Sequence, residues 1–281
     1  MASRAPDGGR KLNDDAPWDA FDPEVYIDHN YRILHPDDAE IISIVRDRFG
    51  DHFRENSGRM LSGIDVGAGA NLYPALAMLP GCDRITLLER SSANVHYLKS
   101  QLRDFDRCWD QFWDVLSKGD KHEVYSRLEA DRRTRFEEVV RVKRGNLFDL
   151  QRSQGRWSIG TMFFVAESMS TSYEEFERGT GCFLNALKPG APFAAAFMEH
   201  SEGYKVGTEW FPACYVSQSQ IADVVGRYSD DVEIFPVGKP GGLLRDGYTA
   251  MILTCGRRNA YVDKPVRSKW WSVQGVNASG S

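Results

Sequence analysis

Several features that commonly identify a protein class are missing from this chain of 281 residues. It has no apolar run long enough to span a membrane, and its first 16 residues lack the apolar core of a signal peptide. It also has no block of Lys and Arg, and its formal net charge is −5, which argues against nucleic acid or a membrane surface as the main partner. These absences predict a cytoplasmic protein that acts on small molecules.

Paired metal or disulfide ligands are also missing. The five cysteines are widely spaced and form no C-x-x-C pair, which argues against a zinc ribbon and against a disulfide framework. The six histidines do not show the spacing of metal ligands either. We therefore expect reduced, mostly buried thiols and no metal.

The length and the 42% hydrophobic content favour one large domain over two small ones. We predict a disordered arm over residues 1–16, a single domain over 17–257 and a C-terminal tail over 258–281, where Trp270 and Trp271 suggest docking. Residues 238–242 are rich in glycine and are predicted to form a mobile loop. Nothing in the sequence decides between a monomer and a homodimer.

Two glycines end the first apolar run of that domain, which spans residues 61–66. A strand that turns at Gly67-x-Gly69 into a helix starting near Asn71 lets the backbone approach a ligand closely, and Glu89, which ends the next apolar run, is suited to bind a ribose diol. A plain strand-to-helix turn is the alternative explanation. The motif lies between a strand pattern and a helix pattern, which favours a nucleoside site.

A third glycine, which a dinucleotide site requires, is absent from this motif. Leu72 stands in its place, so NAD is disfavoured. Asp65, just before the first glycine, suits a positively charged or amine-bearing group, bound directly or through water. The amino acid end of S-adenosylmethionine meets that description better than a pyrophosphate does.

Strand and helix patterns alternate along the chain, which predicts a parallel α/β sheet. An N-terminal helical lid is expected over residues 17–58, with a helix from residue 37 packed on the first strand. We take residues 103–140, which contain Trp109 and Trp113, as a helical surface elaboration. Further strands are predicted over 84–89, 140–147, 157–165 and 192–199, and those at 232–237 and 248–255 are expected to form an antiparallel edge. The predicted helices cover 91–102, 173–187 and 219–228.

The sequence resembles the class I methyltransferases that use S-adenosylmethionine. Within them it is similar to the branch of nicotinamide, phenylethanolamine and thioether amine N-methyltransferases, from about Phe21 to Arg257. The resemblance depends on the opening at residues 21–26 with Tyr31, the loop at 65–73, the turn at 89–94, the insertion and the turn at 187–190. It implies a Rossmann-like fold with a seven-stranded, mostly parallel sheet and an antiparallel edge strand.

The same resemblance implies the donor site, with S-adenosylhomocysteine as the product. Tyr26 and Tyr31 would cover the donor, and Glu89 would bind the ribose. Asn146 stands where the family usually has an acid for the adenine amino group, and its carbonyl can still accept that hydrogen bond. The implied cofactor-binding residues are Tyr26, Tyr31, Asp65, Gly67, Gly69, Tyr73, Glu89, Asn94, Asn146, Leu147 and Phe164, with Val165 beside them.

On the acceptor side, Glu199 matches a family acid that contacts the substrate amine or amide. The predicted catalytic residues are Glu199, Tyr26, His200 and Tyr204, and Glu167 is a weaker candidate at a neighbouring strand end. Family serines near the acceptor are replaced by Gly203 and Ala213, which argues against nicotinamide itself.

Three functions remain open on the sequence. The chain is similar, through its tryptophan-containing opening, to actinobacterial enzymes of specialised metabolism. Some of these methylate indole C3 of tryptophan-derived compounds, with pyrroloindoline ring closure. That reaction needs an aromatic slot and a base. The alternatives are N-methylation of an aromatic or alkyl amine and a non-catalytic module that binds S-adenosylmethionine.

Overall fold

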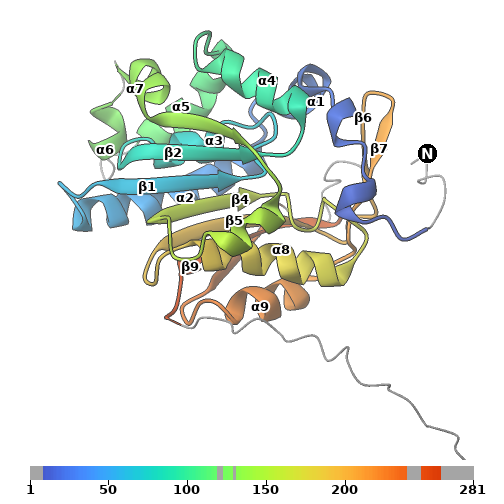
Figure 1. Cartoon of the computed structure of the whole chain (residues 1–281). Coiled ribbons are helices and arrows are strands. Elements are labelled where there is room, and N and C mark those ends of the chain that lie inside the picture. Colours follow the sequence, from blue (N-terminus) through green and yellow to red (C-terminus); the bar gives the residue numbers. More distant parts are fainter. Residues whose placement is uncertain (1–8, 119–122, 129–130, 239–247, 261–281) are drawn as a thin grey trace, which may run out of the picture.

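A seven-stranded sheet forms the centre of the protein in the computed structural model, which describes residues 9–118, 123–128, 131–238 and 248–260. Figure 1 shows the sheet with helices on both sides. The strand order is β3-β2-β1-β4-β5-β9-β8. Neighbours from β3 to β5 are parallel, whereas β9 is antiparallel to both β5 and β8. The predicted sheet and its antiparallel edge are confirmed. The strands are β1 (Leu61–Val66), β2 (Cys82–Glu89), β3 (Val140–Arg144), β4 (Ile159–Phe163), β5 (Pro192–Glu199), β8 (Glu233–Val237) and β9 (Ala250–Arg257).

Helices cover both faces of this sheet, because alternate residues of each central strand point to opposite sides. In β5, Ala194 and Ala196 belong to one apolar cluster, whereas Phe193 and Phe197 belong to the other. The first cluster includes residues of α2 (Pro36–Glu55), α3 (Tyr73–Met78) and α4 (Ser92–Gln101). The second includes α8 (Tyr173–Ala186), α9 (Gln218–Gly226) and the 3₁₀ helix η4 (Leu147–Arg152).

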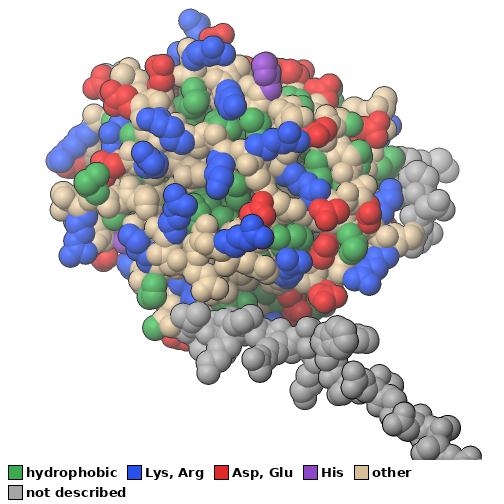
Figure 2. Space-filling view, in the orientation of Figure 1, with side chains coloured by type: hydrophobic (Ala, Val, Ile, Leu, Met, Phe, Trp, Pro, Cys, Tyr) green, Lys and Arg blue, Asp and Glu red, His purple; other side chains and the backbone are tan. Residues whose placement is uncertain are grey.

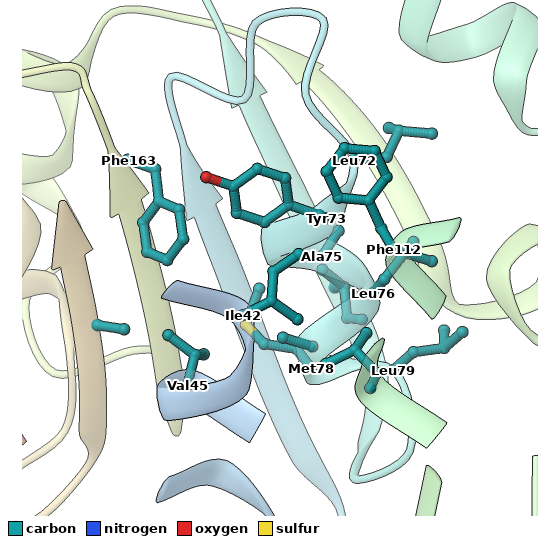
Figure 3. Packing of buried hydrophobic residues seen from close by; sticks show 14 of the residues in the cluster. Ile42, Val45, Leu72, Tyr73, Ala75, Leu76, Met78, Leu79, Phe112 and Phe163 are labelled. Carbon is teal, nitrogen blue, oxygen red and sulfur yellow. The ribbon is translucent and has the colours of Figure 1, made fainter. Parts of the chain in front are cut away.

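The insertion between β2 and β3 is part of the core, so the predicted surface elaboration is wrong. It folds into η3 (Arg107–Trp109), α5 (Asp110–Ser117), α6 (Glu123–Ser126) and α7 (Arg132–Val139). Trp109 and Trp113 are completely buried in the first cluster, where Phe112 stacks on Tyr73 with ring centroids 5.4 Å apart. Figure 3 shows Tyr73 between Phe112 and Phe163. The charged residues of this insertion suggested a solvated face, but its tryptophans fill the space beside α2 and α3.

The N-terminal segment, residues 12–31, crosses the carboxyl ends of the strands as η1 (Asn13–Asp15), η2 (Trp18–Ala20) and α1 (Pro23–Asn30). Helix α1 begins where it does because Pro23 occupies its first turn and the Asp22 carboxylate accepts hydrogen bonds from the N–H groups of Glu24 and Val25. The disordered arm predicted up to residue 16 is wrong for the described residues 9–16. Asn13 is only 3% exposed, because it packs under Trp18 and against Asn146.

A two-stranded hairpin, β6 (Tyr204–Val206) and β7 (Glu209–Phe211), follows β5 and lies beside the N-terminal segment (Figure 1). The sequence patterns did not predict it. At the other end of the domain, Arg258 is 4% exposed and donates from Nε to the carbonyl of Leu184, so the domain extends past residue 257. The predicted loop from residue 239 on and Trp270 with Trp271 lie outside the described residues.

No helix in the described part of the chain is long and apolar enough to cross a membrane. On the face drawn in Figure 2, basic and acidic side chains are interspersed. All five cysteines are free thiols, and only Cys108 is more than slightly exposed.

Candidate active site

A cavity opens at the carboxyl ends of β1, β2 and β4, beneath the N-terminal segment. Its empty space, including the open mouth, is about 770 Å³, which is in the usual range for a small-molecule site. Among the described residues it is lined by Asn13, Trp18, Phe21, Tyr26, Tyr31, Gly67, Ala68, Gly69, Ala70, Asn71, Leu88, Glu89, Arg90, Asn94, Gly145, Asn146, Leu147, Phe163, Phe164, Val165, Ser168, Met169 and Tyr204.

The Gly-rich loop forms the floor of this cavity. Gly67 and Gly69 have φ angles of 63° and 57°, which favour glycine. A Cβ on Gly67 would lie 2.6 Å from a methyl group of Val165, so a side chain there would force the strand ends apart. Helix α3 begins at Tyr73, two residues later than predicted, and the Asn71 side chain accepts a hydrogen bond from the Tyr73 N–H at 3.1 Å.

Glu89 joins this loop to the start of α4. One carboxylate oxygen accepts the Gly69 N–H at 2.8 Å, and the other accepts the Ser91 N–H at 2.7 Å. Burial raises the pKa of this carboxyl, and hydrogen bonds from Ser91, Gly69, the Asn94 side chain and Arg90 oppose the rise. Glu89 lines the cavity, where a carboxylate is suited to accept hydrogen bonds from a diol.

Asn94, in the first turn of α4, lines the cavity next to Glu89. Its side-chain oxygen is buried and has no hydrogen-bond partner within the described residues. A buried polar atom without a partner is costly in free energy, so this oxygen is available to accept a hydrogen bond from a group bound in the cavity. A ribose hydroxyl supplies such a donor. The glycine floor, the Glu89 carboxylate and this oxygen therefore fit the nucleoside of S-adenosylmethionine.

Aromatic rings form the side of the cavity. Tyr26 packs on Phe21 and on Tyr31, with ring centroids 5.0 and 5.7 Å apart, and all three rings line the cavity. Tyr73 does not line it. Its ring supports Tyr31 from below at 5.9 Å, and its hydroxyl donates to Asp38 at 3.2 Å. The predicted contact of Tyr73 with the donor is therefore indirect in this structure.

The N-terminal segment is held over the cavity by polar contacts of its residues Asp14 and Asp19. The Asp19 carboxylate accepts hydrogen bonds from the N–H and the hydroxyl of Ser92, both at 2.8 Å, and from Arg144 at 3.1 Å. The Ser92 donors, followed by Arg144, hold the pKa of Asp19 below its usual value. Asp14 also pairs with Arg90 at 2.9 Å.

Asn146 and Leu147, which were predicted to contact the adenine of the donor, also line the cavity. The Asn146 side-chain oxygen accepts hydrogen bonds from the Phe148 N–H at 3.1 Å and from the Asn13 amide at 3.2 Å. Because both lone pairs of this oxygen are used, an adenine amino group would have to displace Asn13 to bind it. Asn13 was not a predicted site residue, because a contact between positions so far apart leaves no local pattern.

Asp65 is fully buried in β1 and does not line the cavity. Its Oδ1 accepts the Thr161 hydroxyl at 2.7 Å, and its Oδ2 has no partner in the described part of the chain. Burial raises the pKa of this carboxyl to about 8. The role predicted for Asp65 at the donor amine would thus act across the Gly-rich loop or through water.

The predicted catalytic residues separate into two places. Tyr26 and Tyr204 line the cavity, whereas Glu199 and His200 do not. Glu199 accepts the Gln218 N–H at 2.8 Å, and His200 stacks on Tyr215 with ring centroids 4.6 Å apart. His200 has a φ of 57°, in the left-handed region that non-glycine residues rarely adopt. The strand end therefore turns sharply. The Glu199 carboxylate contacts the start of α9, and the His200 ring lies between Tyr215 and Thr249.

Glu167 does not line the cavity but is linked to it by a hydrogen bond from its neighbour Ser168. It is completely buried, and one of its oxygens accepts the Ser168 hydroxyl at 3.1 Å and the Met198 N–H at 3.0 Å. Burial raises the pKa of Glu167 to about 7. Ser168 itself lines the cavity, together with Phe164, which has a φ of 58°. Ser168 and Met169 are further wall residues that the sequence did not reveal.

Groups of His, Cys, Asp and Glu that could bind a metal ion do not occur among the described residues.

The sequence of residues 11–239 matches the profile of the NNMT/PNMT/TEMT family. No curated protein matches the chain.

Several solved structures with a similar fold and low sequence identity are methyltransferases. A SAM-dependent methyltransferase from Methanosarcina mazei is 10% identical with a TM-score of 0.48, and the match covers 81% of this chain and 99% of that one. The Burkholderia thailandensis 1,6-didemethyltoxoflavin-N1-methyltransferase is 12% identical with a TM-score of 0.46, covering 76% and 78%. The Synechocystis magnesium protoporphyrin IX methyltransferase is 9% identical with a TM-score of 0.47, covering 76% and 79%.

Proposed function

The chain belongs to the NNMT/PNMT/TEMT family of S-adenosylmethionine-dependent methyltransferases, and from this premise we propose that it methylates an uncharged aromatic small molecule. The acceptor class we propose is a tryptophan-derived indole, methylated at C3 with pyrroloindoline ring closure. The family match supports the donor, and the wall of the cavity supports the acceptor class.

The observation that carries the acceptor class is the chemistry of the cavity wall. Its outer part is made of the rings of Trp18, Phe21, Tyr26 and Tyr204, which suit a flat aromatic molecule. Glu89 is the one carboxylate among the described lining residues, and it faces the donor end. Because an ammonium group needs a carboxylate partner when it is removed from water, this wall favours an uncharged acceptor.

The reaction on this proposal is an in-line displacement. Indole C3 forms a bond to the methyl carbon while the carbon–sulfur bond breaks and its electron pair stays on sulfur. S-adenosylmethionine, when bound, supplies an activated methyl group, so the residues of the chain chiefly align the reactants and exclude water. Alignment of this kind supplies roughly 7 to 11 kcal/mol in favourable cases. Glu89 and Asn94 would hold the ribose, while Tyr26 and Tyr31 would cover the donor.

Ring closure then requires a proton acceptor. The side-chain nitrogen of the acceptor bonds to indole C2 and loses its proton, which neutralises the positive charge left on the ring. We assign this proton to Glu167 through the Ser168 hydroxyl, which lines the cavity and donates to Glu167. A pKa of about 7 suits a base at neutral pH. Tyr204 also lines the cavity, but burial raises its pKa well above 10, so it is a poor base.

The test is transfer from methyl-labelled S-adenosylmethionine to a panel of tryptophan-derived indoles and aryl-alkylamines, with the label located by NMR. Label on a quaternary ring carbon is the expected result, and label on nitrogen would overturn it. Donor binding without transfer to any compound would instead favour a non-catalytic module that binds S-adenosylmethionine. The family membership argues against that hypothesis.

Amine N-methylation is the second candidate, and the position of Glu199 favours it. This carboxylate ends β5, the strand beside β4, and on this hypothesis it would exchange its hydrogen bond from the Gln218 N–H for one from the substrate amine. In that case Glu199→Gln would abolish transfer to amines, whereas transfer to indole carbon would persist.

A further inference from the structure

Three rings of the cavity wall share one neighbour that does not line the cavity. Phe211, on β7, lies 5.4 Å from Trp18, 5.3 Å from Phe21 and 5.4 Å from Tyr204, measured between ring centroids. Phe211 is 2% exposed and forms a small apolar cluster with Phe21 and Val206, separate from the two clusters of the sheet. Trp18 and Phe21 belong to the N-terminal segment, whereas Tyr204 belongs to the hairpin.

The backbone fixes Phe211 in this position. Phe211 and Tyr204 are direct partners in the β6–β7 pairing, and their rings are stacked at an angle of 22°. Gly203, just before the hairpin, has a φ of 125°, and a Cβ there would lie 2.9 Å from the Phe211 carbonyl oxygen. Only glycine fits at position 203 without moving the backbone of Phe211, so Gly203 allows the end of β7 to lie close to the start of β6.

The N-terminal segment needs an apolar attachment on this side. Its polar contacts from Asp19 to Ser92 and Arg144 are exposed and lie at α4 and β3, and those of Asn13 lie at Asn146 and Glu175, away from the hairpin. Exposed ion pairs contribute little to stability, whereas packed aromatic pairs stabilise by more than the burial of their surface alone. The hairpin, which Figure 1 shows next to the N-terminal elements, provides that attachment through the Phe211 ring.

We propose that Phe211 is a positioning residue that joins the N-terminal segment and the β6–β7 hairpin into one clamp over the donor and the acceptor. Through Trp18 and Phe21 it keeps the segment closed over the donor cavity, and through Tyr204 it fixes the acceptor wall. Closure over the donor therefore completes the acceptor wall. The part concerning the acceptor depends on the function proposed above, whereas the part concerning the donor depends only on family membership.

The deciding experiment measures the dissociation rate of S-adenosylhomocysteine from the full chain by stopped-flow displacement. Phe211→Ala should accelerate dissociation roughly tenfold, since the loss of the Phe211 packing on Trp18 and Phe21 amounts to more than 1 kcal/mol. Trp210→Ala is the matched control, because Trp210 directly precedes Phe211 in the same strand and faces the opposite side of the hairpin. Phe211→Leu, which keeps apolar volume without a ring, replaces the alanine variant if that variant does not fold.

Equal dissociation rates in the Phe211 and Trp210 variants would overturn the proposal. A second measurement, the acceptor KM with the compound that accepts label, should rise in Phe211→Ala and stay unchanged in Trp210→Ala. If no compound accepts label while dissociation is still accelerated, the role of Phe211 in closing the donor cavity is supported and the proposed acceptor is wrong.

Discussion

Glu167 makes stability depend on pH at the scale of a single residue. Its pKa is raised from an ordinary 4.5 to about 7, mainly by burial, so the folded protein keeps this proton when the unfolded chain has lost it. The contribution to stability is thus fully present below pH 4.5 and is lost as the pH rises through about 7, a change of about 3 kcal/mol. Denaturant unfolding of the wild type and of Glu167→Gln from pH 5 to 8 should show this difference.

Glu202→Gln is a suitable control, because it makes the same change of charge at an exposed position. Asp65 adds to the pH dependence of every variant, since burial raises its pKa to about 8. The test therefore depends on the difference in unfolding free energy between the wild type and Glu167→Gln at each pH. Parallel stability curves for the wild type and Glu167→Gln would show that Glu167 ionises in the folded state as it does in water.

Residues inside a short motif were easier to predict than residues that meet across the fold. Gly67, Gly69 and Glu89 line the cavity as the sequence indicated, because a strand-to-helix turn places them there by local geometry. Tyr73 belongs to the same motif but points into the core, where Phe112 of the insertion stacks on it. No pattern near Asn13 indicates its contact with Asn146, since that contact depends on the path of the whole N-terminal segment.

At the scale of elements, the insertion between β2 and β3 stabilises the domain. Trp113 on α5 is fully buried and packs near Tyr125, with ring centroids 6.2 Å apart. Trp113→Ala should lower the free energy of unfolding by roughly 3 to 5 kcal/mol, the range for a large buried aromatic. Urea denaturation followed by circular dichroism would measure it. Trp210→Ala, at a partly exposed position, should cost much less, and a similar cost in both variants would mean that the insertion is peripheral.

Strands of the sheet were predictable from sequence, whereas the hairpin was not. The strands of the sheet are five to eight residues long and mostly buried, so most of them read as apolar runs. Strands β6 and β7 have three residues each and include Lys205 and Glu209, too short and too polar for a recognisable alternation. Their stability comes instead from packing against Trp18 and Phe21, which lie far away in the sequence.

At the scale of the whole molecule, segments from across the chain meet at the carboxyl edge of the sheet. Parallel strands end at one edge, so the loops after β1, β2, β3 and β4 all reach the cavity. The N-terminal segment and the hairpin cover that edge and contact each other. The sequence predicted a site at this edge because the parallel order of the strands follows from the alternation of strands and helices. The positions of the N-terminal segment and the hairpin over this edge depend on contacts between distant segments, which the alternation does not specify.

Donor binding should therefore protect these distant segments together. In hydrogen–deuterium exchange with and without S-adenosylhomocysteine, we expect slower exchange in three places: the Gly-rich loop, the N-terminal segment and the β6–β7 hairpin. The hairpin is informative because only Tyr204 of its residues lines the cavity, so protection of β7 would pass through Phe211. Residues 56–61, at the opposite edge of the sheet, should exchange at the same rate in both states. Protection of the loop alone would mean that donor and acceptor walls form independently.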